Sequence, residues 1–336
     1  MYSYSGKIPV DIVVSGGGTG GHIYPAISIA ETLKQIVPEL RIAFIGNVSG
    51  PEAKLIPQCG FSFYPISVSG FPRYWTWQWG RVILKLATSL VQTFKLFQKL
   101  KPKIVIGTGG YVSGPVLLVA RLKQIPIILQ EQNAIPGLTN RFMAHFVKVA
   151  YLGLPTARPH FPSIGIITGN PVRAEITDPP KKNDRLYHKY GLLPNLKTIF
   201  VMGGSQGATA VNQMVMETMK KISGSNTFDE FQIIHQTGQR DYEIVNDFYR
   251  NQPHISALAK PYFNQIEEIY ALADLLICRA GGSTLSEITA FGVPAVLVPR
   301  PSRDRHQYYN AKVLSNAQAA IIQKQSKTDP KEFLET

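Results

Sequence analysis

Short apolar runs that pass into a glycine-rich turn and then into a helix recur along this 336-residue chain. Val10–Val14 is followed by Ser15-Gly16-Gly17-Gly18-Thr19-Gly20-Gly21-His22, and Leu275–Cys278 is followed closely by Gly281-Gly282-Ser283-Thr284. Each stretch predicts a buried strand, a tight turn and the first turn of a helix. Because parallel sheets with helices on both faces are built by repeating this unit, the sequence predicts an α/β fold with doubly wound domains.

The start of such a helix favours an anion. Backbone N–H groups in the first turn lack helical partners, and the helix dipole adds about half a positive charge, so a phosphate group is stabilised there. Glu287 follows Thr284 by about one turn, where its carboxylate can accept hydrogen bonds from paired hydroxyls such as those of a ribose. The alternative is an ordinary turn in which Ser283 or Thr284 forms a capping box with Glu287, and this stretch alone does not separate the two.

The first glycine loop fits a phosphate or sugar site better than a dinucleotide site. Gly16, Gly18 and Gly21 match the spacing of the dinucleotide fingerprint. However, the next expected strand, Ile42–Ile45, ends in Gly46-Asn47 instead of the acidic residue that a ribose would need, which disfavours a nicotinamide-dependent dehydrogenase. We therefore interpret this loop as a cradle for a diphosphate or a sugar, in preference to a purely structural turn.

The expected strands form two series, which predicts two domains. The first series comprises residues 10–14, 42–45, 103–106 and 125–129, and the second comprises residues 197–202, 231–235, 257–260, 275–278 and 295–298. The proline-rich stretch Thr156–Pro162 and then Thr168-Gly169-Asn170-Pro171-Val172-Arg173 separate the two series. A chain of 336 residues has the length of two ordinary domains, and we place the boundary near Arg173, giving domains of 1–172 and 173–336.

The net charge of +13 is concentrated in the first half of the chain. Residues 1–174 hold 17 Lys and Arg against five carboxylates, a net +12, whereas residues 175–336 hold 18 against 17, a net +1. The first domain therefore faces something anionic, and nucleic acid, an anionic membrane and a phosphorylated substrate all meet that description. With only Cys59 and Cys278 and no metal-ligand spacing, the composition favours reduced thiols in the cytosol.

The segment Phe71–Lys103 carries the signal for a membrane surface. It holds all three tryptophans, Trp75, Trp77 and Trp79, together with seven basic residues and no carboxylate. A helix expected from Gln78 has one polar stripe and one apolar stripe. The polar stripe comprises Arg81, Lys85, Thr88, Gln92, Lys95 and Lys99, and the apolar stripe comprises Trp79, Ile83, Leu86, Leu90 and Phe97. A basic, aromatic amphipathic helix suits an anionic bilayer, and we prefer this to a solvated helix packed on the sheet, which does not explain the tryptophans. No apolar run approaches the roughly 18–20 residues needed to cross a bilayer.

A set of motifs in order along the chain resembles the MurG family, the bacterial transferases that convert lipid I to lipid II. The motifs are Gly16–His22, Gly107–Tyr111, Glu131-Gln132-Asn133, Gly169–Arg173, Gly203–Gly207 and Ser283–Glu287. Each glycine loop alone is common, but the ordered set is specific and spans nearly the whole chain. The resemblance implies a GT-B fold, with two doubly wound, Rossmann-like domains facing each other across a cleft.

The resemblance also implies an activity. Members of the family transfer N-acetylglucosamine (GlcNAc) from UDP-GlcNAc, with inversion, to the muramyl C4 hydroxyl of lipid I, undecaprenyl-diphospho-MurNAc-pentapeptide, in peptidoglycan synthesis. The first domain would then be the acceptor and membrane-facing domain, at the cytoplasmic face of the bacterial inner membrane, and the second the UDP-GlcNAc donor domain. No nucleic-acid partner, metal or other cofactor is expected, and the chain has no Asp-x-Asp motif.

Carried over residue by residue, the resemblance assigns a site. His22 and Glu131 are the candidate general bases. The acceptor-binding residues implied are Gly17, Gly18, Gly109, Gly110 and Tyr111. The donor-binding residues implied in the first domain and at the boundary are Thr19, Gly20, Gly21, Asn133 and Arg173. In the second domain they are Ser205 and Thr284 at the diphosphate, Phe263 at the uracil, Glu287 at the ribose and Gln307 at the sugar, with Ser283, Leu285 and Ser286 beside them.

Several alternatives stay open on the sequence. His22, near the positive end of a helix, can take the proton from an attacking sugar hydroxyl or can simply bind a phosphate. Glu131 can be the base or can order its loop, and Tyr111 can contact the substrate or pack against the turn. The family's usual histidine before Glu-Gln-Asn is Gln130 here, which argues against a catalytic role at that position.

Two other functions compete with this one. One is a related glycosyltransferase acting on diacylglycerol, against which Glu131-Gln132-Asn133 and Gly169–Arg173 argue. The other is a noncatalytic membrane-binding scaffold, which would not need the combination of Thr284, Glu287 and Gln307.

Overall fold

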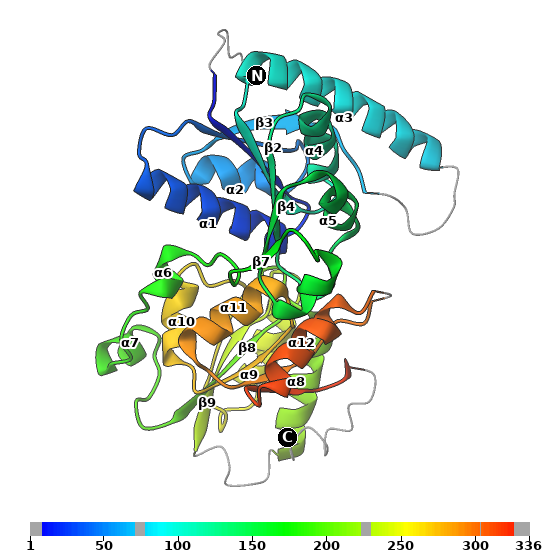
Figure 1. Ribbon diagram of the computed structural model, residues 1–336. Coiled ribbons are helices and arrows are strands. Elements are labelled where there is room, and N and C mark those ends of the chain that lie inside the picture. The colour runs from blue at the N-terminus through cyan, green and yellow to red at the C-terminus, as the bar shows by residue number, and fades with distance from the viewer. Residues whose placement is uncertain (1–8, 71–77, 223–229, 303, 326–336) are drawn as a thin grey trace. The chain divides into compact units, whose positions relative to one another are not determined.

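The computed structural model describes residues 9–70, 78–222, 230–302 and 304–325. The chain divides into two compact units, Met1–Arg173 and Ala174–Thr336 (Figure 1). Each unit is a parallel β-sheet with helices on both faces, so the predicted α/β, doubly wound architecture is confirmed.

The first unit contains a seven-stranded parallel sheet in the order β3-β2-β1-β4-β5-β6-β7. The chain builds outward from β1 to β3 and then returns to the other side of β1 with β4. The carboxyl ends of β1 and β4 therefore flank the point where the strand order reverses, which is where open α/β sheets bind ligands. The strands are β1 (Ile12–Gly16), β2 (Ile42–Asn47), β3 (Ser62–Ile66), β4 (Ile104–Gly109), β5 (Ile127–Glu131), β6 (Val149–Leu152) and β7 (Gly165–Ile167).

Helices cover both faces of this sheet because successive strand residues point to opposite sides. Ile12 and Phe44 pack under α1 (Gly20–Ile36) and α2 (Glu52–Gln58), whereas Val13 and Ile45 pack under α3 (Gln78–Leu100) and α4 (Ser113–Leu122). Each fully buried aliphatic side chain contributes about 1.5–3 kcal/mol to folding. The smaller helical elements are α5 (Leu138–Met143), η1 (Ala144–Phe146) and η2 (Pro155–His160).

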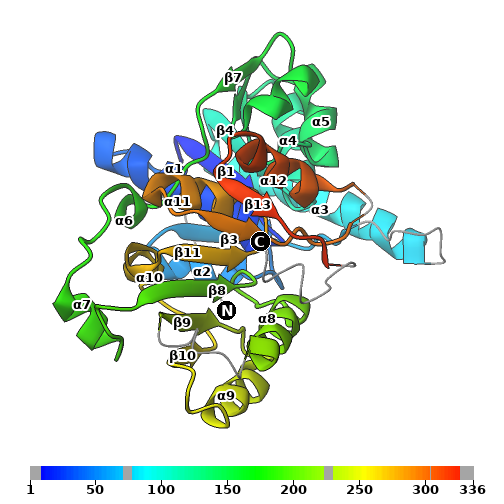
Figure 2. The same ribbon diagram turned by 90° about the horizontal axis from the view of Figure 1, so that it is seen from below.

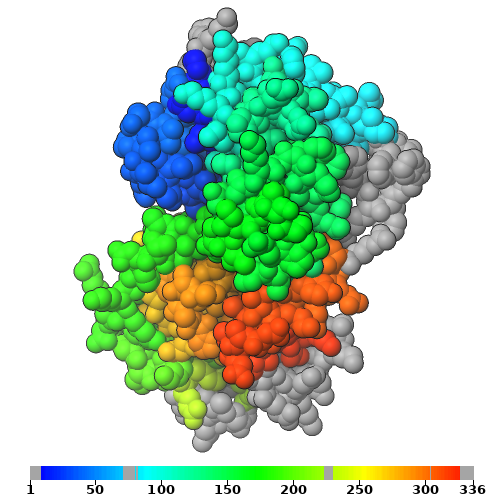
Figure 3. Space-filling view, in the orientation of Figure 1, coloured from blue at the N-terminus to red at the C-terminus, as the bar shows by residue number. Residues whose placement is uncertain are grey.

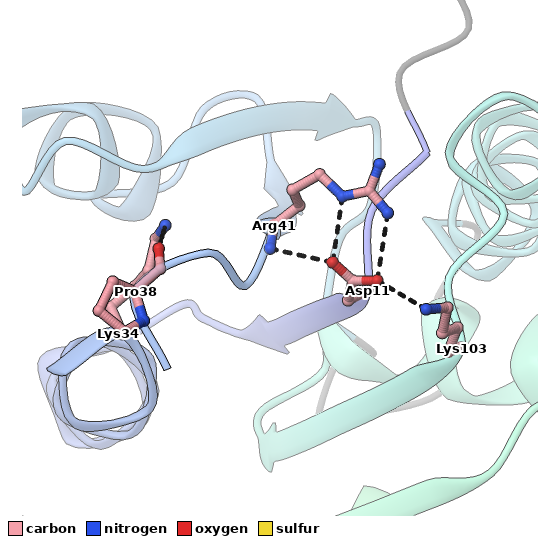
Figure 4. Close-up of polar contacts among 5 residues, drawn as sticks. All are labelled: Asp11, Lys34, Pro38, Arg41 and Lys103. Carbon is pink, nitrogen blue, oxygen red and sulfur yellow. Dashed lines mark hydrogen bonds and ion pairs between the residues drawn. The ribbon is translucent and has the colours of Figure 1, made fainter. Parts of the chain in front are cut away.

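An ion-pair cluster joins the amino ends of three adjacent strands of the first unit, β2, β1 and β4 (Figure 4). Asp11, before β1, accepts from Arg41 Nε at 3.1 Å and from Lys103 Nζ at 2.9 Å, and these two cations precede β2 and β4. The Arg41 hydrogen bonds first, and then Lys103, hold the pKa of Asp11 well below its usual range. The cluster lies at the end of the sheet opposite to the glycine loops.

The second unit contains a six-stranded parallel sheet in the order β10-β9-β8-β11-β12-β13. On one face, Val201 and Ile277 pack under α8 (Thr209–Ile222) and α9 (Tyr242–Arg250). On the other face, Phe200 contacts Tyr270 of α10 (Ile266–Leu272), which lies beside α11 (Gly282–Phe291) (Figure 2). The strands are β8 (Lys197–Met202), β9 (Phe231–Gln236), β10 (Ala257–Lys260), β11 (Leu275–Cys278), β12 (Ala295–Leu297) and β13 (Ala320–Ile322), and the other helices are α6 (Ala174–Thr177), α7 (Asp184–Lys189) and α12 (His306–Asn316).

The strands expected from apolar runs are all present, but several end later than the apolar residues do. In the first unit, β1 and β4 continue into their glycine loops because Gly16 still pairs with Gly109. The register slips just before that pair: Ser15 pairs with Gly107, so Thr108 is one extra residue on β4. Such a β-bulge turns a backbone group out of the ladder. No helix among residues 9–70, 78–222, 230–302 and 304–325 is long and apolar enough to span a membrane.

Candidate active site

The first two glycine loops of the first unit are in direct contact. A Cβ added to Gly110 would lie 2.3 Å from the Gly17 carbonyl oxygen, and one added to Gly18 would lie 2.8 Å from the Tyr111 ring. Gly110 and Gly18 also have φ values of 80° and 84°, which side chains rarely tolerate. Glycine is therefore required at these positions, and the fold brings together all five residues proposed for the acceptor: Gly17, Gly18, Gly109, Gly110 and Tyr111.

Helix α1 begins at Gly20, whereas the apolar spacing of residues Ile23–Ile36 indicates a start at Ile23, three residues later. Thr19 is its extended N-cap residue, and its hydroxyl makes no capping hydrogen bond. Thr19, Gly20 and Gly21 therefore form the positive end of a helix of 17 residues. An anionic group is stabilised at such a position.

His22 is oriented by two oxygen atoms. Its Nδ1 lies 2.9 Å from the carbonyl oxygen of Thr108 and 2.9 Å from Oε1 of Gln132. Because a carbonyl oxygen only accepts hydrogen bonds, Nδ1 must carry the proton, and Nε2 of the neutral ring keeps a lone pair. The bulged Thr108 also donates from Oγ1 to the His22 carbonyl oxygen at 2.8 Å. The ring is held in the tautomer that a general base requires.

The orientation of Gln132 is fixed in turn. Its Nε2 donates to the Thr108 carbonyl oxygen at 2.8 Å and to Oε1 of Gln130, which leaves Oε1 of Gln132 facing His22. Gln130 donates from Nε2 to Oδ1 of Asn170 at 2.9 Å, and Asn170 donates back to the Gln132 carbonyl oxygen at 3.1 Å. Gln130, at the position of the family's usual histidine, thus connects β5 to the loop after β7.

Glu131 is buried, with 1% of its surface exposed, and its carboxylate orders the loop that follows it. The four donors are the backbone and side-chain nitrogens of Asn133, the backbone N–H of Gly137 and Nδ2 of Asn140, at 2.9–3.2 Å. Both carboxylate oxygens are engaged inside the protein. The geometry favours the loop-ordering role of Glu131 over the role of a base open to the acceptor.

Arg173 ends the loop after β7 and lies against α1. Its guanidinium carbon is 5.5 Å from the centre of the Tyr24 ring, a cation–π contact. Tyr24 follows His22 by two residues on α1. The fold therefore brings a positive charge from the end of the first unit to the helix that carries His22.

Glu52 was not predicted from the sequence. It lies in the first turn of α2, has 1% of its surface exposed, and accepts from the Gly18 N–H at 3.2 Å and the Asn47 N–H at 3.0 Å. A Cβ on Gly17 would lie 2.4 Å from its Oε1. The buried carboxylate thus ties the first glycine loop to the end of β2. The sequence feature that could have drawn attention to Glu52 is the scarcity of carboxylates, since the first 174 residues hold only five.

In the second unit, the loops after β8, β10, β11 and β12 carry the proposed donor-binding residues at one edge of the sheet. Ser205 is exposed in the turn after β8, and the backbone of this turn packs against the loop after β9: a Cβ on Gly207 would lie 2.1 Å from the Thr237 carbonyl oxygen. Buried Gln236 donates to the Gly204 carbonyl oxygen at 3.2 Å and accepts from the Phe263 N–H at 3.0 Å. One amide side chain therefore connects the glycine loop to the segment proposed for the nucleobase.

The ring of Phe263 belongs to the core. It is 3% exposed and meets Tyr190 and Phe200 edge to face, with ring centres 6.3 Å apart in both pairs. The resemblance places Phe263 at the uracil, and any such contact has to come from its main chain.

Helix α11 begins at Gly282, and its N-cap is the extended Gly281, which makes no side-chain capping bond. Ser283 and Thr284 therefore lie inside the helix and not at the N-cap position that a capping box with Glu287 requires. Glu287 lies in the second turn, where Oε2 accepts from the hydroxyl of Tyr270 at 2.8 Å. Burial, and then the charge of Glu287, raises the pKa of the nearby Cys278 thiol to about 12.

Gln307 is the second residue of α12, and its Oε1 accepts from the Arg300 N–H at 2.8 Å. The helix is attached to the loop after β11 through buried Asn310, which donates to the Ala280 carbonyl oxygen at 3.1 Å. Gln307 and the 283–287 segment are therefore held by elements that contact each other within the second unit.

Comparison with known proteins gives the family. Residues 12–152 match the glycosyltransferase family 28 N-terminal domain and residues 198–336 match the family 28 C-terminal domain. A relative from Halothermothrix orenii, named UDP-N-acetylglucosamine--N-acetylmuramyl-(pentapeptide) pyrophosphoryl-undecaprenol N-acetylglucosamine transferase, is 41% identical over 94% of this chain and 86% of its own. A relative of the same name from Moorella thermoacetica is 38% identical over 93% of this chain and 85% of its own. The chain belongs to the MurG group of glycosyltransferase family 28.

Solved structures agree with this placement. The crystal structure of Acinetobacter baumannii MurG has a TM-score of 0.73 at 30% identity and covers 97% of this chain and 89% of that chain. A glycotransferase of kitacinnamycin, at 15% identity and a TM-score of 0.68, shares the fold. The expected GT-B architecture of this family 28 member is therefore confirmed at the level of its two Rossmann-like domains.

Proposed function

We propose that this family 28 member transfers GlcNAc from UDP-GlcNAc to the muramyl C4 hydroxyl of lipid I, releasing UDP and forming lipid II for peptidoglycan. The relatives' names describe this reaction. The observation that carries the proposal is His22, held with its proton on Nδ1 at the edge of the sheet where the glycine loops meet. A diacylglycerol-dependent transferase and a noncatalytic scaffold find no support in these observations.

The acceptor side of the reaction is assigned to the first unit. Nε2 of His22 takes the proton of the C4 hydroxyl while that oxygen attacks the anomeric carbon of GlcNAc. The bond between the anomeric carbon and the UDP oxygen breaks with its electron pair leaving on UDP, so a single displacement inverts the configuration. Gly17, Gly18, Gly109, Gly110 and Tyr111 are assigned to the acceptor, and Glu131 keeps the loop of Asn133 in shape.

The donor side is assigned chiefly to the second unit. Ser205 and the start of α11 are placed at the diphosphate, Glu287 at the ribose, the main chain of Phe263 at the base and Gln307 at the sugar. The leaving UDP gains negative charge, which helix N-termini and Arg173 can stabilise by charge-assisted hydrogen bonds. We therefore propose that no metal is required, so turnover should persist in EDTA, and a complete loss reversed by Mg²⁺ would contradict this.

The membrane is the third proposed partner, and α3 supplies its surface. Outside the buried Phe97, the helix exposes apolar Ile83, Leu84, Val91 and Phe94 between basic residues, with Leu84 69% exposed. Nζ of Lys123, the residue that follows α4, lies 4.1 Å from the centre of the Phe94 ring. The expectation that Trp75 and Trp77 contribute lies outside the described residues, as does that for the Trp79 side chain.

Helix α4 packs against α3, and α5 packs against α4, so that their atoms follow one another in Figure 3. Leu138 and Phe142 of α5 and Leu122 at the end of α4 are exposed, next to Arg141 and Arg121. Exposed apolar side chains mixed with cations fit the interface of an anionic bilayer, where each cation contributes about 1 kcal/mol. We expect binding to anionic vesicles that weakens as salt screens the charges.

The test of the activity is UDP release from UDP-GlcNAc with and without a lipid I analogue. We expect release that depends on the acceptor and that falls by about 10²–10⁴-fold in His22→Gln. The matched control is His160→Gln, an exposed histidine of η2 in the same unit, which should retain activity. Acceptor-independent release, or equal activity in both variants, would overturn the proposal.

A further inference from the structure

The hydroxyl of Tyr270 has a single proton and two neighbours that can accept it. Oε2 of Glu287 lies 2.8 Å away, and the sulfur of Met202 lies 3.7 Å away. A carboxylate oxygen is a much stronger acceptor than a thioether sulfur, so the proton goes to Glu287. Residues on two different helices, α10 and α11, are thereby joined by a charge-assisted hydrogen bond.

The tyrosine ring is fixed by the core, so the position of its hydroxyl is fixed too. Tyr270 is 1% exposed, stacks on Phe291 with ring centres 5.2 Å apart, and meets Phe200 edge to face at 5.7 Å. Glu287, by contrast, is a half-buried side chain with several rotatable bonds. The rigid partner therefore gives the flexible carboxylate a fixed donor toward which Oε2 turns.

We propose that Tyr270 is a positioning residue that turns the Glu287 carboxylate toward the ribose hydroxyls of a uridine nucleotide and so sets selectivity for ribose over 2′-deoxyribose. This rests on the proposed function, which places Glu287 at the ribose. A carboxylate receives two neighbouring hydroxyls well only when its plane is correctly turned. A site built to bind a hydroxyl discriminates against an analogue that lacks it, because the buried partner is then left unpaired.

The experiment compares the affinities of UDP and 2′-deoxy-UDP, by isothermal titration, in the unaltered protein and in Tyr270→Phe. The substitution removes one oxygen and keeps the ring packing. We expect the unaltered protein to prefer UDP, and the ratio of the two affinities to fall about fivefold to tenfold in Tyr270→Phe, mainly through weaker UDP binding. Glu287→Gln should reduce the ratio in the same direction.

Tyr249→Phe is the matched control. Tyr249 is also buried in the second unit, 6% exposed on α9, and its hydroxyl lies 3.0 Å from Nδ1 of His235. Removing that oxygen should lower the melting temperature and leave the UDP to 2′-deoxy-UDP ratio unchanged. Thermal unfolding of both variants, followed by circular dichroism, measures the loss of stability that they share.

Two results would overturn the positioning role of Tyr270. One is an unchanged ratio in Tyr270→Phe, and the other is an equal fall of the ratio in both tyrosine variants, which would indicate general loosening of the unit. If the unaltered protein does not bind UDP at all, the proposed function itself fails. If it binds UDP without preferring it to 2′-deoxy-UDP, the placement of Glu287 at the ribose fails, and the positioning role with it.

Discussion

The two units share an architecture but support their glycine loops with different chemistry. In the first unit, the loops are held by the buried carboxylates Glu52 and Glu131, which accept from backbone N–H groups and side-chain amides. In the second unit, neutral amides support two of the loops, Gln236 the loop after β8 and Asn310 the loop after β11. The first unit is the one with the net charge of +12, so its surface charge and its buried charge have opposite signs.

A group that holds a loop in shape can either weaken or leave unchanged the ability of that loop to bind an anion. A carboxylate under a loop takes up N–H groups that would otherwise face a phosphate, as Glu52 does with the Gly18 N–H, and it adds negative charge beneath the site. A neutral amide fixes the loop without adding negative charge beneath the site. Under the proposed function, the positive potential at the helix starts of the second unit then remains for the UDP leaving group, which becomes more negative.

The largest effect is expected at Glu131. Glutamine at this position has one acceptor oxygen, and its NH₂ group would face donors such as the Gly137 N–H. We expect Glu131→Gln to lower the free energy of unfolding by about 3 kcal/mol, since hydrogen bonds to a charge are replaced by unpaired donors. Urea denaturation measures it, with exposed Glu39→Gln as the control. A loss below about 1 kcal/mol would mean that the carboxylate is not what holds the loop.

The second largest loss of stability is expected at Glu52, because its carboxylate accepts from two backbone N–H groups, whereas that of Glu131 accepts from four donors. We expect Glu52→Gln to cost about 2 kcal/mol of unfolding free energy. Its kinetic effect should fall on the acceptor, raising the KM for a lipid I analogue more than the KM for UDP-GlcNAc. The reverse pattern would contradict the assignment of the first glycine loop to the acceptor.

The third largest effect is expected in the pH dependence of stability, which should differ between the two units. Complete burial lowers the pKa of His235 to about 3. The unfolded chain takes up this proton as pH falls below 6.5, whereas the folded second unit does not until about pH 3, so stability is full above 6.5 and decreases through this window. The slope is at most about 1.4 kcal/mol per pH unit. Urea denaturation at pH 7, 6 and 5 should show this dependence, and a slope unchanged in His235→Gln would exclude His235 as its source.

The smallest effect is expected at the ion-pair cluster of the first unit. Arg41 and Lys103 are 49% and 74% exposed, so solvent screens their attraction to Asp11, and Asp11→Asn should cost about 1 kcal/mol or less. The lowered pKa of Asp11 means that its contribution is present above pH 3.8 and is lost only as pH falls below that value. If the difference in stability between the unaltered protein and Asp11→Asn is already lost at pH 5, Asp11 does not contribute in the pH range assigned to it.

The sequence was sufficient to predict where the loops gather but not what supports them. A strand that ends in glycines shows its turn locally, and parallel strands bring such turns to one edge of a sheet. Tyr270 and Glu287, or Gln132 and His22, meet only after folding, across 17 and 110 residues, and no local pattern encodes those pairs. The strands β3, β6, β7 and β13 were also not expected, because none of them is a long apolar run that passes into a glycine turn.

Two local sequence patterns were present but did not give the structural detail that they predict. Ser283, Thr284 and Glu287 satisfy the capping-box pattern, yet α11 begins one residue before Ser283 and is capped by Gly281. On α3, the expected apolar stripe includes both Ile83, which is exposed, and Phe97, which is buried. Helical periodicity gives the faces of a helix, but the neighbouring elements decide which apolar face is covered.

The bulge at Thr108 has a consequence for how this active site can vary. The oxygen that fixes the proton of His22 on Nδ1 belongs to the main chain, and every amino acid has such an oxygen. Replacement of the residue at position 108 therefore cannot delete it, whereas one base change can delete the amide of Gln132, the second acceptor. A substitution at position 108 should therefore leave the tautomer of His22 unchanged. A one-residue deletion in β4 should change it, because the strand would regain a regular ladder and the carbonyl group would turn away from His22.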